Sequence, residues 1–218
     1  MSRTRVQNFS ISLDGFGTGV PQSLEAPFGH AGERLHEWMF ATKFWDEGSG
    51  SDGVDNAFAE RHSQGIGAEI MGANKFGPPG WQDDPDWKGW WGPNPPFHTP
   101  TFVLTHRPQP SIEMDGGTTF HFVTEGIHGA WERAREAAGG RDVRLGGGTA
   151  TIRQYLEARL VDEMHVAIGR VLLGSGEHLL GGLDLRALGY EVSEYVPTPN
   201  AAHFVLTKRS DTARATSR

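Results

Sequence analysis

The feature that most constrains the fold is a short strand that runs directly into three glycines and then into a helix. Residues 142–145 carry the strand pattern, and the glycines at positions 146–148 end it. A helix is predicted from residue 149, where apolar residues recur at helical spacing. Those residues are Ile152, Tyr155, Leu156 and Leu160. A strand, a tight turn and a helix in this order are typical of an α/β fold with a parallel sheet.

The same turn has a chemical meaning. Glycines let the backbone approach a ligand closely, and the first turn of a helix offers unpaired N–H groups at its positive end. A pyrophosphate is the ligand that suits such a turn best. The segment has neither the G-x-G-x-x-G spacing nor a G-K-[ST] sequence. A tight turn that binds nothing is therefore the alternative interpretation.

Strand and helix patterns alternate along most of the chain. The expected strands are residues 3–12, 66–71, 101–105, 119–123, 142–145, 164–168, 190–196 and 203–208, and the expected helices are 33–44, 56–64, 127–138 and the segment from 149. This alternation predicts a mostly parallel sheet with helices on both faces, and the last two strands predict an antiparallel C-terminal hairpin. Ligands of such sheets bind beyond the carboxyl ends of the strands.

Composition excludes several classes of protein. The 218 residues fit one domain, which we place at residues 1–209, with 210–218 as a disordered tail. The chain has no cysteine and no apolar run long enough for a signal peptide or membrane span, so we expect a cytoplasmic protein without a membrane partner. The net charge of -7 argues against a nucleic-acid partner, and the ten histidines show no metal-ligand spacing.

The segment 72–100 differs from the rest of the chain in its tryptophans and prolines. It holds Trp81, Trp87, Trp90 and Trp91 together with seven prolines. So much aromatic surface must pack against something, because an exposed patch of this kind promotes aggregation. Three interpretations remain open: a roof over a substrate site, a contact between the subunits of a homodimer, and a flap packed on the protein's own surface.

Several strings in order along the chain resemble one known family. These are SISLDG, IMGANKFG, VLTHRP, GGG, LVDE and LLGSGEHLL, which together span about residues 3 to 208. The chain resembles the dihydrofolate-reductase-like family, especially the reductase domain of riboflavin biosynthesis and its stand-alone relatives. The resemblance implies a dihydrofolate-reductase-like α/β fold and a reduced nicotinamide cofactor, NADPH.

The resemblance also implies which residues bind NADPH. The pyrophosphate would lie on the glycine turn, and two further loops would contribute. Arg107 is the leading candidate for the 2'-phosphate, because Ala73 stands where folate reductases usually carry Arg. A solvated surface Arg107 is the alternative. The expected cofactor-binding residues are Gly72, Lys75, Thr105, His106, Arg107, Gly146, Gly147, Gly148, Thr149 and Ala150.

The substrate side of the resemblance is less complete. Asp14, in the loop after the first strand, and Glu37 are the candidate proton donors, and Trp38, Trp90 and Trp91 are the candidates for substrate contact. Folate reductases place an acid early in the helix after this loop, and no carboxylate aligns there. We therefore expect an NADPH-dependent reductase of an unidentified small heterocycle, which could be pterin-, pyrimidine- or flavin-like. The alternative is a non-catalytic binding protein with the same fold.

Overall fold

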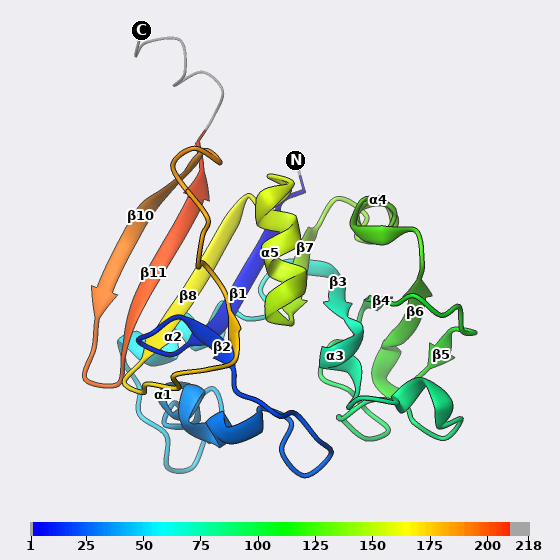
Figure 1. Cartoon of the computed structure of the whole chain (residues 1–218), viewed down its shortest axis with the longest axis horizontal. Coiled ribbons are helices and arrows are strands. Elements are labelled where there is room, and N and C mark those ends of the chain that lie inside the picture. The colour runs from blue at the N-terminus through cyan, green and yellow to red at the C-terminus, as the bar shows by residue number, and fades with distance from the viewer. Residues whose placement is uncertain (1, 210–218) are drawn as a thin grey trace, which may run out of the picture.

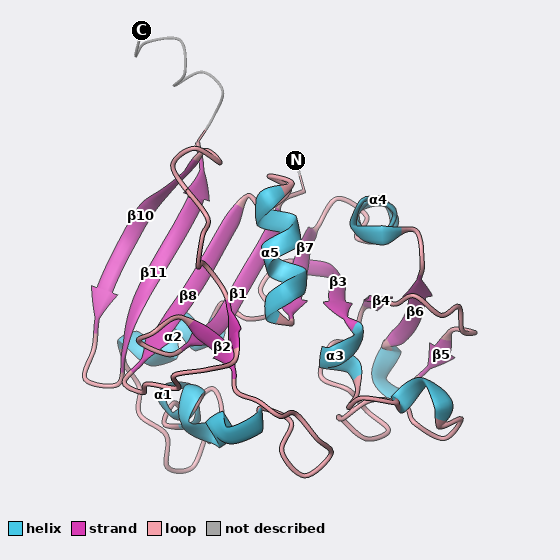
Figure 2. Ribbon diagram, in the orientation of Figure 1, coloured by secondary structure: helices cyan, strands magenta, loops and turns pink. Residues whose placement is uncertain are grey.

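The computed structural model describes residues 2–209, and nine strands of this part of the chain form one sheet (Figures 1 and 2). The six central strands are mutually parallel, and antiparallel strands flank them at both edges. This arrangement, with its C-terminal hairpin, confirms the predicted fold class. In spatial order the strands are β10 (Tyr190–Pro197), β11 (Ala201–Lys208), β8 (Glu163–Gly169), β1 (Thr4–Ile11), β7 (Asp142–Gly147), β3 (Ile66–Gly72), β4 (Pro100–Leu104), β6 (Thr119–Val123) and β5 (Ile112–Glu113).

Helices cover both faces of the sheet, as predicted. On one face, α4 (Gly126–Ala137) and α5 (Thr149–Glu157) bury their apolar sides against the central strands. The buried side of α4 consists of alanines, which let the helix axis approach the sheet closely. On the other face lie the short helices α1 (Glu37–Phe40) and α2 (Val54–Glu60), which pack around the buried side chains of Trp38 and Phe58.

The face under α1 and α2 is polar as well as buried. A β-bulge in β1 adds one residue between the pairs Val6 with Met164 and Phe9 with Val166. The bulge places the neighbouring residues Gln7 and Asn8 on this same face, although successive residues of a regular strand alternate.

Asn8 begins a buried polar chain behind this bulge. Its side-chain oxygen lies 3.0 Å from Nδ1 of His165, whose Nε2 lies 3.0 Å from His203. Asp55 then accepts a hydrogen bond from His203 at 2.9 Å. All four residues are buried, so the chain fixes the strands of this face to α2.

Two segments differ from their predicted structure. The predicted helix over 33–44 is wrong as one element, because a 3-10 helix, η1 (Gly29–Leu35), precedes the separate helix α1. The backbone at His36 leaves the helical range between them. The predicted loop after β1 also contains a strand, β2 (Phe16–Thr18), which pairs with β9 (Glu177–His178). The predicted disordered tail, 210–218, lies outside the described residues.

The tryptophan-rich segment packs on the edge of its own sheet. It begins with α3 (Ala73–Phe76) and continues through the 3-10 helix η2 (Trp81–Asp83). Trp81 is buried among Phe76, Phe120 and Phe122, and the Trp91 ring also faces this cluster. The structure thus favours the self-packed flap for Trp81. Trp90 and Trp91, in contrast, are only half-buried.

Candidate active site

A cleft of about 530 Å³ opens at the carboxyl ends of β1, β7 and β3. Its lining comes from segments that are far apart in sequence. These are β1 with the loop after it, α1 with the residue before it, the segment after α2, α3 with the tryptophan-rich segment, and the glycine turn before α5. This is the place where open α/β sheets hold their ligands. A drug-sized ligand needs a pocket of about 300 to 1,000 Å³, so the cleft is large enough for a ligand of this size.

The glycine turn forms one wall of the cleft. Gly147 has a φ of 117°, a conformation that residues with a side chain rarely adopt. Helix α5 begins after Gly148 with no side-chain cap. The N–H groups of its first turn are therefore not paired with any side chain where they face the cleft. A Cβ built on Gly148 would meet nothing within 4 Å. This wall therefore presents open space directly in front of a positive helix end.

A buried ion pair forms the floor of the cleft. Arg144 and Glu69 lie on neighbouring strands, and Nη2 of Arg144 is 2.7 Å from one carboxylate oxygen of Glu69 and 2.9 Å from the other. Both side chains are at most 5% exposed. The Arg144 guanidinium also contacts Nε2 of His62. Such a pair persists in a core only when its geometry is good, because removing two charges from water is costly.

The same floor carries polar atoms that the protein leaves unpaired. Four buried side-chain atoms around the cleft have no hydrogen-bond partner within residues 2–209: Gln7 Oε1, His36 Nδ1, His62 Nδ1 and Arg144 Nε. Buried polar atoms are nearly always hydrogen-bonded in native proteins. Their gathering at one cleft is what a site for a polar ligand would show.

The two histidines at the cleft are neutral at physiological pH. Burial and, to a smaller extent, the nearby charge of Lys75 lower the pKa of His36 to about 4. Burial and the adjacent Arg144 guanidinium lower the pKa of His62 to about 2. A neutral imidazole can both donate and accept a hydrogen bond, so these rings suit a ligand edge that carries both kinds of group.

The remaining wall is aromatic and apolar. Phe28, Met39, Phe40 and Trp45 face the cleft from the segment that follows β1, and Trp90 and Trp91 face it from the tryptophan-rich segment. A polar floor beneath such a wall favours a flat ring system with polar atoms on one edge.

Lys75 lies where the wall of glycines meets the floor. Its Nζ donates a hydrogen bond to the carbonyl oxygen of Gly146 at 2.6 Å. Of the predicted cofactor residues, Lys75, Gly146, Gly147, Gly148 and Thr149 line the cleft together. Gly72 and Ala150 do not line it. A Cβ on Gly72 would meet Thr151 Oγ1 at 2.3 Å, so this glycine allows β3 and α5 to pack.

The predicted adenosine-side residues follow β4 and do not belong to the cleft lining. Thr105 Oγ1 accepts a hydrogen bond from the backbone N–H of Arg107. The Arg107 side chain forms an exposed ion pair with Asp83 at 2.7 Å. His106 is exposed. These residues lie at the carboxyl end of the strand next to β3, but the structure does not join them to the glycine turn.

The two candidate proton donors lie elsewhere. Asp14 accepts hydrogen bonds from Ser12 Oγ and from the backbone N–H groups of Leu173 and Gly174. The Ser12 hydroxyl is the main cause that lowers the pKa of Asp14 to about 2. This carboxylate therefore fixes two loops together as an anion.

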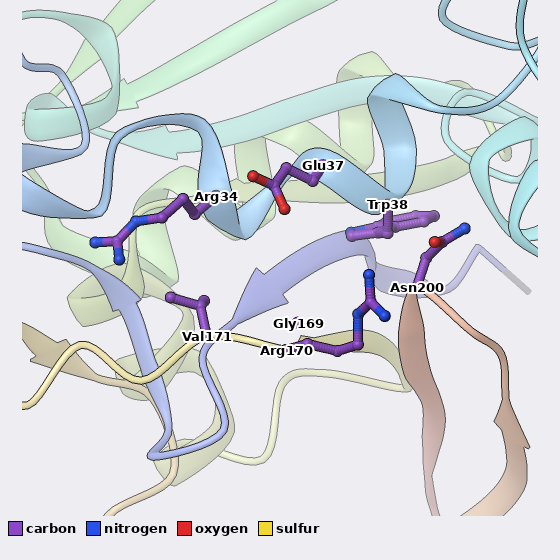
Figure 3. A pocket seen from close by; sticks show the side chains of 7 residues that line it. All are labelled: Arg34, Glu37, Trp38, Gly169, Arg170, Val171 and Asn200. Atoms are coloured by element: carbon purple, nitrogen blue, oxygen red, sulfur yellow. The ribbon is translucent and has the colours of Figure 1, made fainter.

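Glu37 and Trp38 belong to a separate pocket of about 50 Å³, beside Arg170 and Asn200 (Figure 3). Trp38 is 2% exposed, and its Nε1 donates a hydrogen bond to Ser10. Its position is that of a core residue, and the predicted substrate contact has no support in the cleft lining. Of the predicted substrate residues, Trp90 and Trp91 do face the cleft.

Several cleft residues were missed by reasoning from sequence. Gln7, His62 and Arg144 line the floor, and Glu69 lies beneath it as the partner of Arg144. Two of them left a signal that could have been used. Glu69 and Arg144 are charged residues with apolar or small residues on both sides within their short strands, and a buried pair is the simplest way to accommodate both.

Comparisons with known proteins agree with this architecture. No curated protein sequence matches the chain significantly. A putative riboflavin biosynthesis protein from Shewanella sp. PV-4 aligns over 96% of this chain and 100% of its own, with 19% identity and a TM-score of 0.60. A diaminohydroxyphosphoribosylaminopyrimidine deaminase/5-amino-6-(5-phosphoribosylamino)uracil reductase from Thermotoga maritima aligns over 95% of this chain and 57% of its own, with 11% identity and a TM-score of 0.56.

A dihydrofolate reductase from Enterococcus faecalis aligns over 76% of this chain and 88% of its own, with 18% identity and a TM-score of 0.44. Within residues 2–209, no helix is long and apolar enough to cross a bilayer. The same residues contain no group of three or more His, Asp or Glu side chains placed to hold a metal ion. The family model of the RibD C-terminal domain matches residues 5–204, and the chain therefore belongs to that family.

Proposed function

We propose that this protein is an NADPH-dependent reductase of a small, flat heterocycle, of pterin, pyrimidine or flavin type. The observation that carries the proposal is one cleft with two unlike surfaces. An open glycine turn at a helix start forms one wall, and a polar floor with four unpaired buried atoms adjoins it. The reductase named in Thermotoga maritima has a similar fold, which supports a reaction of the same general class.

The residues at the glycine turn fit a dinucleotide. Gly147 and Gly148 keep the wall free of side chains, and the first turn of α5 supplies N–H groups to a pyrophosphate. Thr149 adds a hydroxyl at the same place. When bound, a reduced nicotinamide supplies the hydride of the reaction.

The protein's own residues would then bind and shield the substrate. The neutral rings of His36 and His62 and the Gln7 amide can orient a polar ring edge by hydrogen bonds. Phe28 and Trp45 on the opposite wall exclude water from the ring face. Reduction in such a site also needs one proton donor at the atom that gains a proton.

The preference for NADPH over NADH rests on Arg107. Its guanidinium can present two donors to a 2'-phosphate, but it is paired with Asp83. The pair is exposed, with 56% of the Arg107 side chain and 69% of the Asp83 side chain accessible, and exposed pairs contribute only about 0 to 1 kcal/mol. A phosphate can therefore compete for Arg107 at little cost.

A cofactor titration tests the glycine turn. Gly148→Val should fold, because the backbone φ of -71° suits valine and a Cβ there meets no neighbour. The new side chain would occupy the space in front of α5. We expect the Kd for NADPH to rise at least about tenfold, equivalent to about 1.4 kcal/mol. Gly53→Val, at another glycine with open space around its Cβ, is the matched control and should leave the Kd unchanged.

Turnover tests the rest of the proposal. NADPH consumption should be followed spectroscopically over a panel of pterins, flavins, pyrimidines and quinones. Turnover of a ring compound that Gly148→Val slows would support the reductase. An unchanged Kd in folded Gly148→Val would refute the cofactor site. Tight NADPH binding without turnover on any compound of the panel would favour the non-catalytic binding protein.

A further inference from the structure

The end of the Lys75 side chain lies against Gly146, where a residue with a side chain would contact it. Lys75 belongs to α3, directly after β3, and its side chain reaches across to β7. The Nζ atom donates to the Gly146 carbonyl oxygen at 2.6 Å, and a Cβ on Gly146 would lie 2.7 Å from it. The ammonium group is therefore held at one point of the cleft, between the glycine turn and the polar floor.

Lys75 is the one cleft-lining Lys or Arg within residues 2–209 that has no carboxylate within ion-pair distance. Arg144, the other such residue, forms its pair with Glu69. His36 and His62, whose pKa values the charge of Lys75 helps to lower, are neutral. The floor thus carries one uncompensated positive charge, and that charge is on Nζ.

The surroundings of Nζ make its proton easier to release. Burial, and to a smaller extent the Arg144 charge, lower the pKa of Lys75 to about 8, although the Glu69 charge acts in the opposite direction. An acid with a pKa near the working pH is the most effective kind for proton transfer. Neither histidine can serve, since both have lost their extra proton at neutral pH.

We propose that the Nζ ammonium of Lys75 is the proton donor of the reaction, and that the substrate presents a carbonyl oxygen or an imine nitrogen to it. This inference rests on the proposed reductase function. A reduced nicotinamide dinucleotide supplies hydride to the carbon of the C=O or C=N group, and the Nζ proton goes to the oxygen or nitrogen. The products are CH–OH or CH–NH and an oxidised nicotinamide, and the neutral amine of Lys75 regains a proton from solvent.

Competitive acetylation tests Lys75 without any substrate. The whole chain is treated with trace acetic anhydride at a series of pH values from about 6 to 11, and the modified lysines are quantified by mass spectrometry. Lys75 should titrate near 8, with the exposed Lys88 of the same sample as internal reference. A Lys75 whose pKa is not lowered would overturn the proposal. A much weaker NADPH affinity in Lys75→Met would make Lys75 a phosphate ligand and would also overturn it.

Variants test the role in turnover. Lys75→Met should bind NADPH within about threefold of the wild type but lose at least about a hundredfold in kcat on the best compound of the panel. Wild-type kcat should be flat at low pH and fall as pH rises above 8, because the protonated form is active. Lys75→Arg keeps the charge but not a releasable proton, so its kcat should stay low and show no such fall.

The outcomes separate the two proposals. Wild-type turnover that survives in Lys75→Met would overturn the role of Lys75 and leave the reductase intact. A chain that neither binds NADPH nor consumes it would overturn both. If the panel yields no substrate, the acetylation result decides, since a Lys75 that titrates with Lys88 cannot be the donor described.

Discussion

Breaking the buried pair between Arg144 and Glu69 should destabilise the protein far more than removing both charges. The two carboxylate contacts of Arg144 are 2.7 and 2.9 Å, and both side chains are almost fully buried. Removing one partner of such a pair costs about 3 to 5 kcal/mol, because the remaining charge is left without a partner. Replacing both by apolar residues of similar volume is often close to neutral. We therefore expect Arg144→Met and Glu69→Met each to lower the free energy of unfolding by about 4 kcal/mol.

Urea unfolding of the wild type, the two single variants and the double variant completes a mutant cycle. The double variant should be more stable than the sum of the single effects implies, by at least about 2 kcal/mol. In thermal unfolding, each single variant should lose roughly 10 °C in Tm. The exposed pair of Lys43 and Asp52, at 3.2 Å, is the control, and its cycle should give a coupling below about 1 kcal/mol. Additive effects at Arg144 and Glu69 would refute the reasoning.

Three further predictions concern other parts of the molecule. Burial lowers the pKa of His165 to about 3, so below pH 6.5 the unfolded chain binds a proton at this residue that the folded chain does not bind. At pH 5 this one group should lower the free energy of unfolding, measured in urea, by about 2 kcal/mol. Arg107→Ala should weaken the binding of NADPH more than that of NADH in calorimetric titrations, whereas Asp83→Ala should not. Equal losses of affinity for both cofactors would show that Arg107 does not bind the 2'-phosphate. Trp90→Ala and Trp91→Ala should raise the KM of the best substrate at unchanged sedimentation mass, and a shift to lower mass would instead place the two rings in a subunit contact.

The sequence predicted the sheet well because its strands are short runs of apolar or alternating residues that end at glycines, prolines or polar turns. The order of elements, the glycine turn and the C-terminal hairpin follow from local patterns of this kind. The segment 29–40 was harder, because its apolar residues have helical spacing while Gly32 and His36 interrupt the helix. Spacing reports which residues are buried together, but not whether one continuous helix buries them.

The candidate site was only half predictable. The glycine turn is continuous in sequence, so Gly147 and Gly148 could be identified directly. The floor is built from residues on different strands, and Arg144 becomes informative only when the sheet order brings Glu69 beside it. Asp14 was chosen for its place in the chain, yet its carboxylate is occupied by loop hydrogen bonds. Position along the chain locates a loop, but not the direction of its side chains.

The bulge in β1 has a consequence for comparing this chain with others. Side chains of a strand alternate between its two faces, and the extra residue moves every later side chain to the face opposite to the one that unbroken alternation would give. Val6, Phe9 and Ile11 all lie on the face of the sheet that α4 and α5 cover, at spacings of three and then two residues. An alignment that is correct up to Val6 but omits one position at the bulge would exchange the core and cleft sides of the strand. In such an alignment Ser10 would be assigned to the apolar core, and Ile11 to the side where Trp38 lies.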